Sequence, residues 1–467
     1  MEKYDLVIIG GGAAAFAAAT RANDLNAKTA MVNAGLPIGG TCVNVGCVPS
    51  KHLLEVGNEL YYPGRNHFDA IRGRKADFDF NTAITQKDAL VETLQKSNYI
   101  DVLDYLSQTT LYERRGRFVS ENEVEVDGQR LRGERILIAT GGSTNVIPFD
   151  GIDQVDYLTN VEALSLKKQP ESMIIVGAGP LGLEFAQMYA HFGTQVTVLE
   201  KEPRILPLEE FEVSLVLQQY LEEEGISFYT GVQIERVAEA DGVRTVQAQV
   251  EGKTRAFEAE QLLIATGVRA NVDGLNLEAT GVELDERGFV QANDELQTTA
   301  PHIYAAGDVV GRTFLETVAA KEGSVAARNA LAGEHNTIDY QSIPHAVFTN
   351  PQVASVGMTE AQFMERFNVC ACRTVEMSQV PKALAVGDTR GLVKMVIHPQ
   401  TTEVVGVHIV ASVAAEMIHE AALAVKYKLT IDDIIDTVHV FPTFSEAIKL
   451  AAQAFYRDIS KMSCCIE

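Results

Sequence analysis

Short continuous apolar runs recur along the first two-thirds of the chain, each bounded by small or polar residues. Such runs are typical of parallel strands that are buried on both faces. They predict strands at residues 6–9, 29–32, 135–138, 173–176, 195–199, 261–264 and 303–305. Between them the sequence predicts helices at residues 13–23, 52–60 and 314–332, another from residue 182 to about 191, and a long amphipathic helix at 83–108.

The pattern changes after residue 343, where longer alternating segments replace the apolar runs. They predict strands at residues 353–357, 391–397 and 404–410, with helices between and after them. Alternation of this kind indicates an antiparallel sheet in a separate α+β domain. The first two-thirds is predicted to be α/β.

Two glycine motifs each stand between a predicted strand and a predicted helix. The first contains Gly10, Gly12 and Ala15, and the second contains Gly177, Gly179 and Gly182. In this context the glycines let the backbone approach a pyrophosphate at the N-terminus of the helix. The sequence therefore predicts two Rossmann-like dinucleotide-binding domains.

The strand after each motif should end in an acidic residue that holds a ribose hydroxyl. Glu200 fulfils this for the second motif, whereas Asn33 stands at that position for the first. Glu200 would repel a 2′-phosphate and so favours NADH, but Lys201 and Arg204 could accept that phosphate and so allow NADPH.

Two predicted strands end in Ala-Thr-Gly, at residues 139–141 and 265–267. The repeated pattern predicts one dinucleotide unit inserted within the other. The predicted domains are residues 1–145 with 268–335, residues 146–267, and residues 340–467.

The chain of 467 residues has a formal net charge of −24, with 63 acidic and 39 basic side chains. This charge disfavours nucleic acid as a partner. No signal peptide and no apolar run long enough to span a membrane is recognisable. Six cysteines are too few for a disulfide scaffold in a chain of this length. They are expected to be thiols of a cytoplasmic protein.

Cys42 and Cys47 lie in a run that resembles a turn entering a helix. At a helix start, unpaired N–H groups and the helix dipole favour a thiolate. The pair could be a reversible disulfide, a soft-metal site, or two buried structural thiols.

The two glycine motifs, the Cys-x4-Cys run and the Ala-Ala-Gly-Asp at residues 305–308 together resemble the flavoprotein pyridine nucleotide-disulfide oxidoreductases. The resemblance covers essentially the whole chain. It implies FAD on the first motif, NADPH or NADH on the second, and a homodimer formed through the third domain. It implies FAD contacts at Gly10, Gly12, Ala15, Asn33, Gly35, Gly40, Thr41, Lys51, Ala139, Thr140, Gly141, Gly307, Asp308 and Leu315. It implies nicotinamide contacts at Gly177, Gly179, Gly182, Glu200, Lys201 and Arg204.

The resemblance also implies roles at the reacting centre. Cys47 would be the thiolate against the flavin, and Cys42 the outer, interchange thiol. Lys51 would lie near the flavin N5 atom and pair with Glu184, and Asp308 would bind the ribityl chain.

Members that reduce organic disulfides carry His-x-His-Pro-Thr near the C-terminus, and the second His protonates the leaving thiolate. This chain has Phe441 at that position, and phenylalanine cannot carry a proton. His439 is expected to be structural. Glu446, which would orient the missing His, also fits a capping box with Thr443.

Cys464 and Cys465 near the C-terminus resemble the vicinal pair of mercuric reductases, as does the Val-Pro-Lys-Ala run at 380–383. Mercury(II) is a soft ion that prefers two thiolates, so a tail pair could pass it to Cys42 and Cys47 of the partner subunit. Cys370 and Cys372 alternate along a predicted strand and could bind a metal, but a structural role is favoured.

The sequence therefore predicts a homodimeric mercury(II) reductase that takes Hg(II) from small thiols. Pro180 and Thr443 occupy positions where mercuric reductases often have tyrosine, and their N-terminal metal-binding domain is not present before the first motif. Two alternatives remain, a dihydrolipoamide dehydrogenase-like disulfide reductase and a non-enzymatic flavoprotein that sequesters soft metals.

Overall fold

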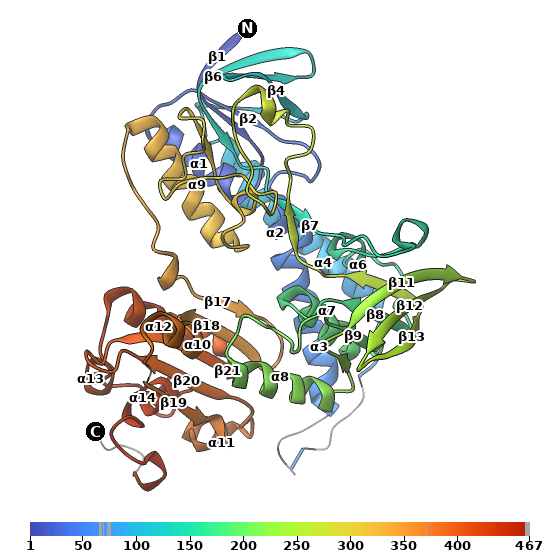
Figure 1. The fold of residues 1–467 in the computed structure, drawn as a ribbon, viewed down its shortest axis with the longest axis vertical. Coiled ribbons are helices and arrows are strands. Elements are labelled where there is room, and N and C mark those ends of the chain that lie inside the picture. The colour runs from blue at the N-terminus through green and yellow to red at the C-terminus, as the bar shows by residue number, and fades with distance from the viewer. Residues whose placement is uncertain (65–67, 69, 72–75, 370, 463–467) are drawn as a thin grey trace.

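The computed structural model describes residues 1–64, 68, 70–71, 76–369 and 371–462. The predicted fold class is confirmed: two α/β units with parallel sheets precede an antiparallel α+β unit. Figure 1 shows the sheet of the first unit at the top with α1 and α9, and the second and third units side by side below it. No described helix is both long enough and apolar enough to cross a membrane.

A seven-stranded sheet forms the first unit, in the order β3-β2-β1-β6-β5-β4, with β16 paired to β6. Its strands are β1 (Glu2–Ile9), β2 (Thr29–Val32), β3 (Thr109–Tyr112), β4 (Gly116–Ser120), β5 (Glu123–Val126), β6 (Gln129–Ile138) and β16 (Ile303–Ala305). β1, β2, β3, β6 and β16 run parallel. β2, β16 and the C-terminal halves of β1 and β6 are largely buried, as the apolar runs predict, whereas the edge strand β3 is only partly buried. Its helices are α1 (Ala13–Asp24), α2 (Gly40–Val45), α3 (Cys47–Tyr61), α4 (Phe80–Gln95), α5 (Asp101–Leu103) and α9 (Glu316–Ala332).

The chain returns to this sheet after the second unit, and the return brings α9 against α1 (Figure 1). Small residues allow the two helices to pack closely. A Cβ atom built on Gly323 of α9 would lie 2.0 Å from the Ala14 carbonyl oxygen of α1. This packing places the N-terminus of α9 beside the first glycine motif.

The long helix predicted at residues 83–108 is wrong in its extent. The α-helix α4 ends at Gln95, a π-helical turn spans Lys96–Ile100, and the short α5 ends at Leu103. The amphipathic repeat does not distinguish α from π hydrogen bonding, so the predicted helix continued through the π-helical turn to residue 108.

The second unit contains a four-stranded parallel sheet in the order β10-β9-β8-β14. Its strands are β8 (Ser172–Val176), β9 (Gln195–Leu199), β10 (Ser227–Tyr229) and β14 (Gln261–Ile264), and its helices are α6 (Asn160–Ala163), α7 (Pro180–Phe192) and α8 (Phe211–Glu223). An antiparallel sheet of β11 (Gln233–Ala240), β12 (Val243–Val250) and β13 (Lys253–Ala259) packs beside it. The strands β7 (Gly142–Thr144) and β15 (Val268–Ala270) pair where the chain enters and leaves this unit.

The third unit is a five-stranded antiparallel sheet in the order β17-β18-β21-β20-β19. Its strands are β17 (His345–Val347), β18 (Gln352–Gly357), β19 (Ala371–Glu376), β20 (Leu392–Ile397) and β21 (Val404–Ala411). Its helices are α10 (Glu360–Phe367), α11 (Pro381–Val386), α12 (Ala414–Tyr427), α13 (Ile431–Asp436) and α14 (Glu446–Gln453).

Buried charged groups connect the second unit to the sheet of the third unit. Glu209 accepts hydrogen bonds from His345 and Ser355, both at 2.5 Å. Lys394 of β20 is almost fully buried and pairs with Glu210 at 3.1 Å. Because breaking a buried pair leaves an uncompensated charge, these contacts fix where the third unit sits against the second.

Candidate functional site

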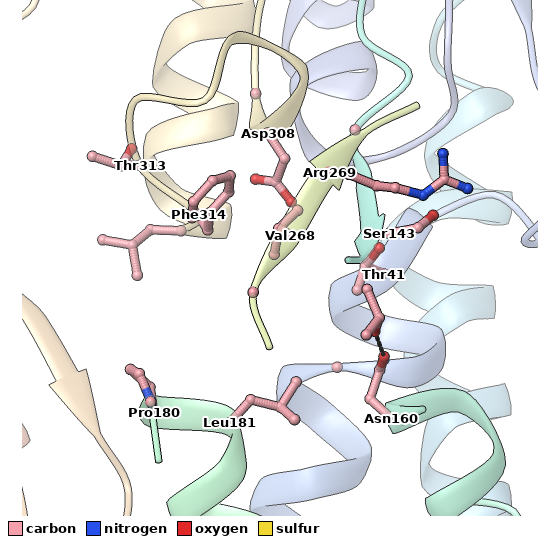
Figure 2. Close-up of a pocket in the computed structure, with 18 of the residues that line it drawn as sticks. Thr41, Ser143, Asn160, Pro180, Leu181, Val268, Arg269, Asp308, Thr313 and Phe314 are labelled. Atoms are coloured by element: carbon pink, nitrogen blue, oxygen red, sulfur yellow. Dashed lines mark hydrogen bonds between the residues drawn. The ribbon is translucent and has the colours of Figure 1, made fainter. Parts of the chain in front are cut away.

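One cavity of about 2100 Å³ connects both glycine motifs. The predicted contact residues that line it are Gly10, Gly12, Asn33, Gly35, Gly40, Thr41, Ala139, Thr140, Gly141, Gly307, Asp308, Leu315, Gly177, Gly179, Glu200 and Lys201. Figure 2 shows Pro180 and Leu181 of α7 on one side of this cavity and Asp308 and Phe314 on the other. The volume is larger than a typical single-ligand pocket of about 300–1,000 Å³ and suits two dinucleotides.

The first glycine of each motif is required because the backbone of a neighbouring strand end lies too close for a side chain. Gly10 has φ +140°, and a Cβ there would lie 2.1 Å from the Ala139 carbonyl oxygen. Gly177 has φ +106°, and its Cβ would lie 2.4 Å from the Ala265 carbonyl oxygen. Each motif thus turns tightly against an Ala-Thr-Gly strand end, leaving the N-termini of α1 and α7 open to the cavity. These features fit bound dinucleotides.

Some predicted contact residues do not line the cavity among the residues the structure describes. Ala15 is fully buried within α1. Gly182 serves packing, since a Cβ there would lie 2.0 Å from the Gly177 carbonyl oxygen. Arg204 instead donates to Ser214 Oγ at 3.1 Å and to the Pro207 carbonyl at 2.7 Å.

Glu200 lies at the end of β9, as predicted, and is buried. Its carboxylate accepts hydrogen bonds from the Ala178 N–H at 2.5 Å and the Glu202 N–H at 2.8 Å. The side chain therefore holds the turn of the second motif.

Asp308 opens the short 3₁₀ helix Asp308–Val310 after β16. Burial and the nearby charge of Glu322 raise the pKa of its carboxyl to about 6. Glu322 of α9 also accepts a hydrogen bond from the Gly307 N–H at 2.6 Å. Glu322 therefore fixes the turn that presents Asp308, a role that the sequence pattern did not reveal.

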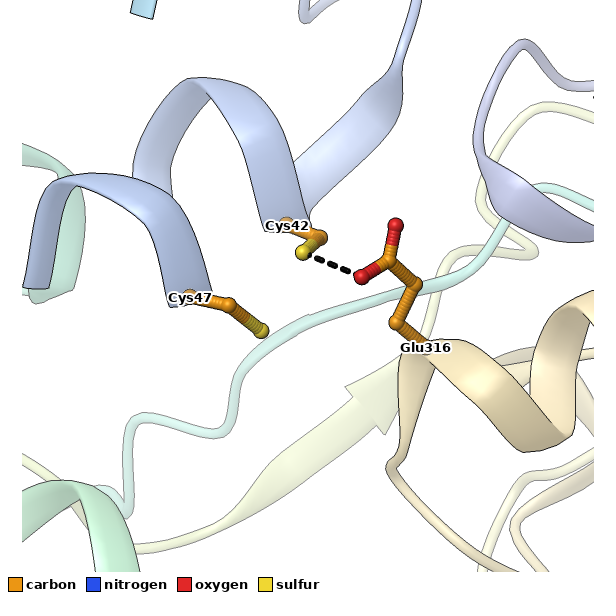
Figure 3. A group of neighbouring side chains, drawn as sticks. All are labelled: Cys42, Cys47 and Glu316. Atoms are coloured by element: carbon orange, nitrogen blue, oxygen red, sulfur yellow. Dashed lines mark hydrogen bonds between the residues drawn. The ribbon is translucent and has the colours of Figure 1, made fainter. Parts of the chain in front are cut away.

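The two cysteines lie on consecutive helices at the edge of the cavity (Figure 3). Cys42 is in the middle of α2, and Cys47 is the first residue of α3, directly after Gly46. The predicted helix start is therefore confirmed for Cys47. Among the described cysteines neither is in a disulfide, so the structure shows the dithiol form.

The two thiols differ in acidity. The side-chain contact with Cys42, together with the Lys51 charge, holds the pKa of Cys47 below its usual range despite opposing burial. Hydrogen bonding with Cys47, burial and Glu316 together raise the pKa of Cys42. Of the two, Cys47 therefore forms the thiolate more readily, and Cys42 keeps its proton.

Lys51 pairs with Glu184, as predicted, with 2.7 Å between Nζ and Oε2. The second carboxylate oxygen of Glu184 accepts a hydrogen bond from the Phe348 N–H at 3.0 Å. Lys51 also lies over the Phe348 ring, 4.7 Å from its centroid. Lys51 lies one turn of α3 after Cys47. The positive charge of its ammonium lowers the pKa of the Cys47 thiol.

Replacing Lys51 by methionine is expected to move the reaction of Cys47 with iodoacetamide to higher pH. The ammonium stabilises the thiolate, so its loss raises the pKa of Cys47. The measurement is the alkylation rate against pH in the reduced protein, with the cysteine identified by mass spectrometry. Lys253→Met, on the exposed strand β13, serves as the control. An unchanged profile in Lys51→Met would rule out this role of the ammonium.

Phe441 lies after α13, and 45% of its surface is exposed. His439 donates a hydrogen bond from Nε2 to Glu420 Oε1 at 2.8 Å, which agrees with a structural role. The capping box predicted for Thr443 and Glu446 is wrong, because α14 begins after Ser445 and that position makes no side-chain cap. Thr443 instead donates to the Val440 carbonyl.

The predicted tail pair, Cys464 and Cys465, lies outside the described residues, as does Cys370. Cys372 lies on β19 and is half-buried.

Glu316 is the functional candidate that the sequence analysis missed. It begins α9, and its Oε2 atom accepts a hydrogen bond from the Cys42 thiol at 2.6 Å. No motif spacing points to it, because it reaches Cys42 only through the packing of α9 on α1.

Residues 4–326 match the family described as pyridine nucleotide-disulphide oxidoreductase, and residues 343–452 match its dimerisation domain. A mercuric reductase of Bacillus cereus is 40% identical over 462 residues, which cover 99% of this chain and 73% of that protein. Dihydrolipoyl dehydrogenase 1, mitochondrial, of Arabidopsis thaliana is 35% identical over 464 residues, which cover 97% of this chain and 91% of that protein.

The Escherichia coli flavoprotein disulfide reductase RclA, solved as a Cu(II) complex, has a similar fold. Its TM-score is 0.87 at 27% identity, and the match covers 98% of this chain and 100% of that one. Both matched domains and the dinucleotide cavity agree with these relatives. The chain therefore belongs to the pyridine nucleotide-disulphide oxidoreductases, flavoprotein enzymes that contain FAD and use NAD(P)H.

Proposed function

We propose that this oxidoreductase reduces mercury(II) to elemental mercury at Cys42 and Cys47. The proposal rests on the two free cysteines, Cys42 and Cys47, at the edge of the dinucleotide cavity, where the Lys51 charge lowers the pKa of Cys47. The mercuric reductase of Bacillus cereus, at 40% identity, supports it. Two soft sulfur ligands suit mercury(II) better than any other common donor set.

The residues of the chain bind and release the ion. When bound, FAD supplies the relay of an electron pair from NAD(P)H to the cysteine pair. The electron pair, with one proton from solvent, first opens the Cys42–Cys47 disulfide to a thiol on Cys42 and a thiolate on Cys47. Mercury(II) then displaces the Cys42 proton to solvent and is held between the two sulfurs. A second electron pair reduces the ion, which leaves as the uncharged atom, and Cys42 takes up a proton again.

Phe441 argues against an organic disulfide as the substrate. Cleavage of a disulfide requires a proton for the leaving thiolate, and the phenyl ring cannot provide one. His439, two residues earlier, is engaged with Glu420. Reduction of a metal ion held by Cys42 and Cys47 releases no organic thiolate and does not need this acid. For this reason we favour metal reduction over a dihydrolipoamide dehydrogenase-like activity.

We further propose that Cys464 and Cys465 collect mercury(II) from small thiols and pass it to Cys42 and Cys47 of the partner subunit in a homodimer. The match of residues 343–452 to a dimerisation domain supports the pairing of two chains. Two adjacent thiolates can exchange a soft ion with the inner pair by successive ligand replacement.

Replacing both tail cysteines by alanine is expected to lower mercury-dependent NAD(P)H oxidation by about tenfold or more when mercury(II) is scarce and small thiols are in excess. The matched control is Cys372→Ala, which alters a thiol on β19. Equal rates of the double variant and the intact chain at low mercury would contradict the relay role. A lack of any mercury-dependent oxidation by the intact chain would contradict the proposed function itself. Cu(II) is tested in parallel, because RclA was solved as a Cu(II) complex.

A further inference from the structure

Glu316 stands beside the two thiols and completes a group of three ligating side chains (Figure 3). Its Oε2 atom lies 2.6 Å from Cys42 Sγ. One oxygen of Glu316 and the two sulfur atoms all lie within 4.8 Å of one another. Ligand atoms of one zinc-sized ion, with bonds of about 2.0–2.3 Å, fall within such a distance of one another.

The carboxylate of Glu316 is held from several sides. As the first residue of α9, it follows Leu315, whose backbone is extended, and the α9–α1 packing fixes the helix start. Its Oε1 atom accepts a hydrogen bond from the Tyr99 hydroxyl at 3.2 Å. Tyr99 in turn packs edge-on against Phe16, with ring centroids 4.9 Å apart. One oxygen is thus anchored while the other faces the thiols, an arrangement common for ligating carboxylates.

We propose that Glu316 is the third ligand of a two-sulfur, one-oxygen site formed with Cys42 and Cys47. This inference rests on the proposed function to the extent that the cysteine pair binds a metal ion. A linear mercury(II) dithiolate needs only the two sulfurs. The added carboxylate widens the choice of ion, because borderline divalent cations such as Zn(II) accept mixed sulfur and oxygen ligands. Zn(II) therefore binds the reduced site and competes with mercury(II) there.

A purely structural role of Glu316 makes a different prediction. An acidic side chain in the first turn of a helix is favourable in itself, since it interacts with the helix dipole. In that case its neutralisation would weaken α9 slightly and leave the affinity for metal ions unchanged. The two roles are therefore separable by direct metal binding.

The experiment uses the FAD-containing protein with its thiols kept reduced by a phosphine, and Zn(II) as the probe, since Zn(II) is not reduced during the measurement. The affinity is measured by competition with a chromophoric chelator. Glu316→Gln is expected to weaken Zn(II) binding by about tenfold or more. X-ray absorption at the zinc edge should show two sulfur ligands with oxygen in the intact protein, and loss of an oxygen contribution in the variant.

Two further variants test whether the effect is specific to Glu316 and whether its hydrogen bond with Tyr99 matters. Glu278→Gln removes the same charge from an exposed position outside the cavity and should leave Zn(II) binding unchanged. Tyr99→Phe keeps the ligand but removes its anchor, and should weaken Zn(II) binding in the same direction. Unchanged Zn(II) affinity in Glu316→Gln would overturn the proposal. If that variant does not fold, unchanged affinity in Tyr99→Phe would overturn it.

Failure of this inference is distinguishable from failure of the proposed function. If Zn(II) binds the Glu316→Gln variant as tightly as the intact protein, and mercury-dependent NAD(P)H oxidation is normal, only the role of Glu316 as a ligand is ruled out. If Zn(II) binding depends on Glu316 but no mercury-dependent oxidation occurs, the three-ligand site is supported and the proposed reductase function is contradicted.

Discussion

Cys47→Ser is expected to lower mercury-dependent NAD(P)H oxidation by at least about a thousandfold, the scale seen when an essential nucleophile is removed. Cys47 is the more acidic thiol of the pair, because its contact with Cys42 and the positive charge of Lys51 lower its pKa. A serine hydroxyl is not ionised at neutral pH and is a poor ligand for a soft ion. The measurement is the steady-state rate of mercury-dependent oxidation.

The matched control for this change is Cys372→Ser, which makes the same substitution on β19. It should retain the activity of the intact chain. The Cys47→Ser protein should still bind FAD, because Cys47 is the first residue of α3 and makes no backbone contact that serine cannot make. Mercury-dependent oxidation within about tenfold of the intact rate would show that the ion is reduced elsewhere.

Gly323→Ala is expected to destabilise the first unit by about 2 kcal/mol or more and to lower its FAD content. The added Cβ would lie 2.0 Å from the Ala14 carbonyl oxygen, so α9 must move away from α1. Overpacking of this kind costs about 3 kcal/mol. The gain in helix propensity from glycine to alanine is about 1 kcal/mol and does not offset it.

Thermal release of FAD, followed by flavin fluorescence, measures this effect. Gly64→Ala is the control, because a Cβ there meets nothing within 4 Å. The displaced α9 also carries Glu322, which holds the Gly307 N–H beside Asp308. Loss of the α1–α9 contact should therefore also disturb the turn at Gly307 and Asp308 and weaken FAD binding. A melting temperature for Gly323→Ala equal to that of the control would contradict the close α1–α9 contact.

The sequence predicted the features whose causes are local. Apolar runs such as residues 6–9 and 173–176 became buried parallel strands, because a strand covered on both faces can hold few polar side chains. The glycine motifs were recognisable because the turns at Gly10 and Gly177 tolerate no side chain. The Lys51–Glu184 pair could be expected only from the resemblance to a family, since 133 positions separate the two residues.

Features that depend on tertiary packing were missed. Glu316 lies 274 positions from Cys42, and nothing in its surroundings in the chain marks it as a ligand. Glu322 became important only where α9 passes the Gly307 turn. The helix at 83–108 was drawn too long for the opposite reason, since the local pattern continued after the hydrogen bonding had changed at Lys96.

Transfer of electrons from the cysteine pair to mercury(II) produces volatile elemental mercury, which can be measured. The intact protein is supplied with NAD(P)H, mercury(II) and excess small thiol, and the elemental mercury carried off in a gas stream is compared with the NAD(P)H consumed. Equal molar amounts of the two are expected, because NAD(P)H gives two electrons and the reduction of one mercury(II) ion takes two. Consumption of NAD(P)H without release of elemental mercury, or mercury binding without consumption of NAD(P)H, would contradict this transfer of electrons.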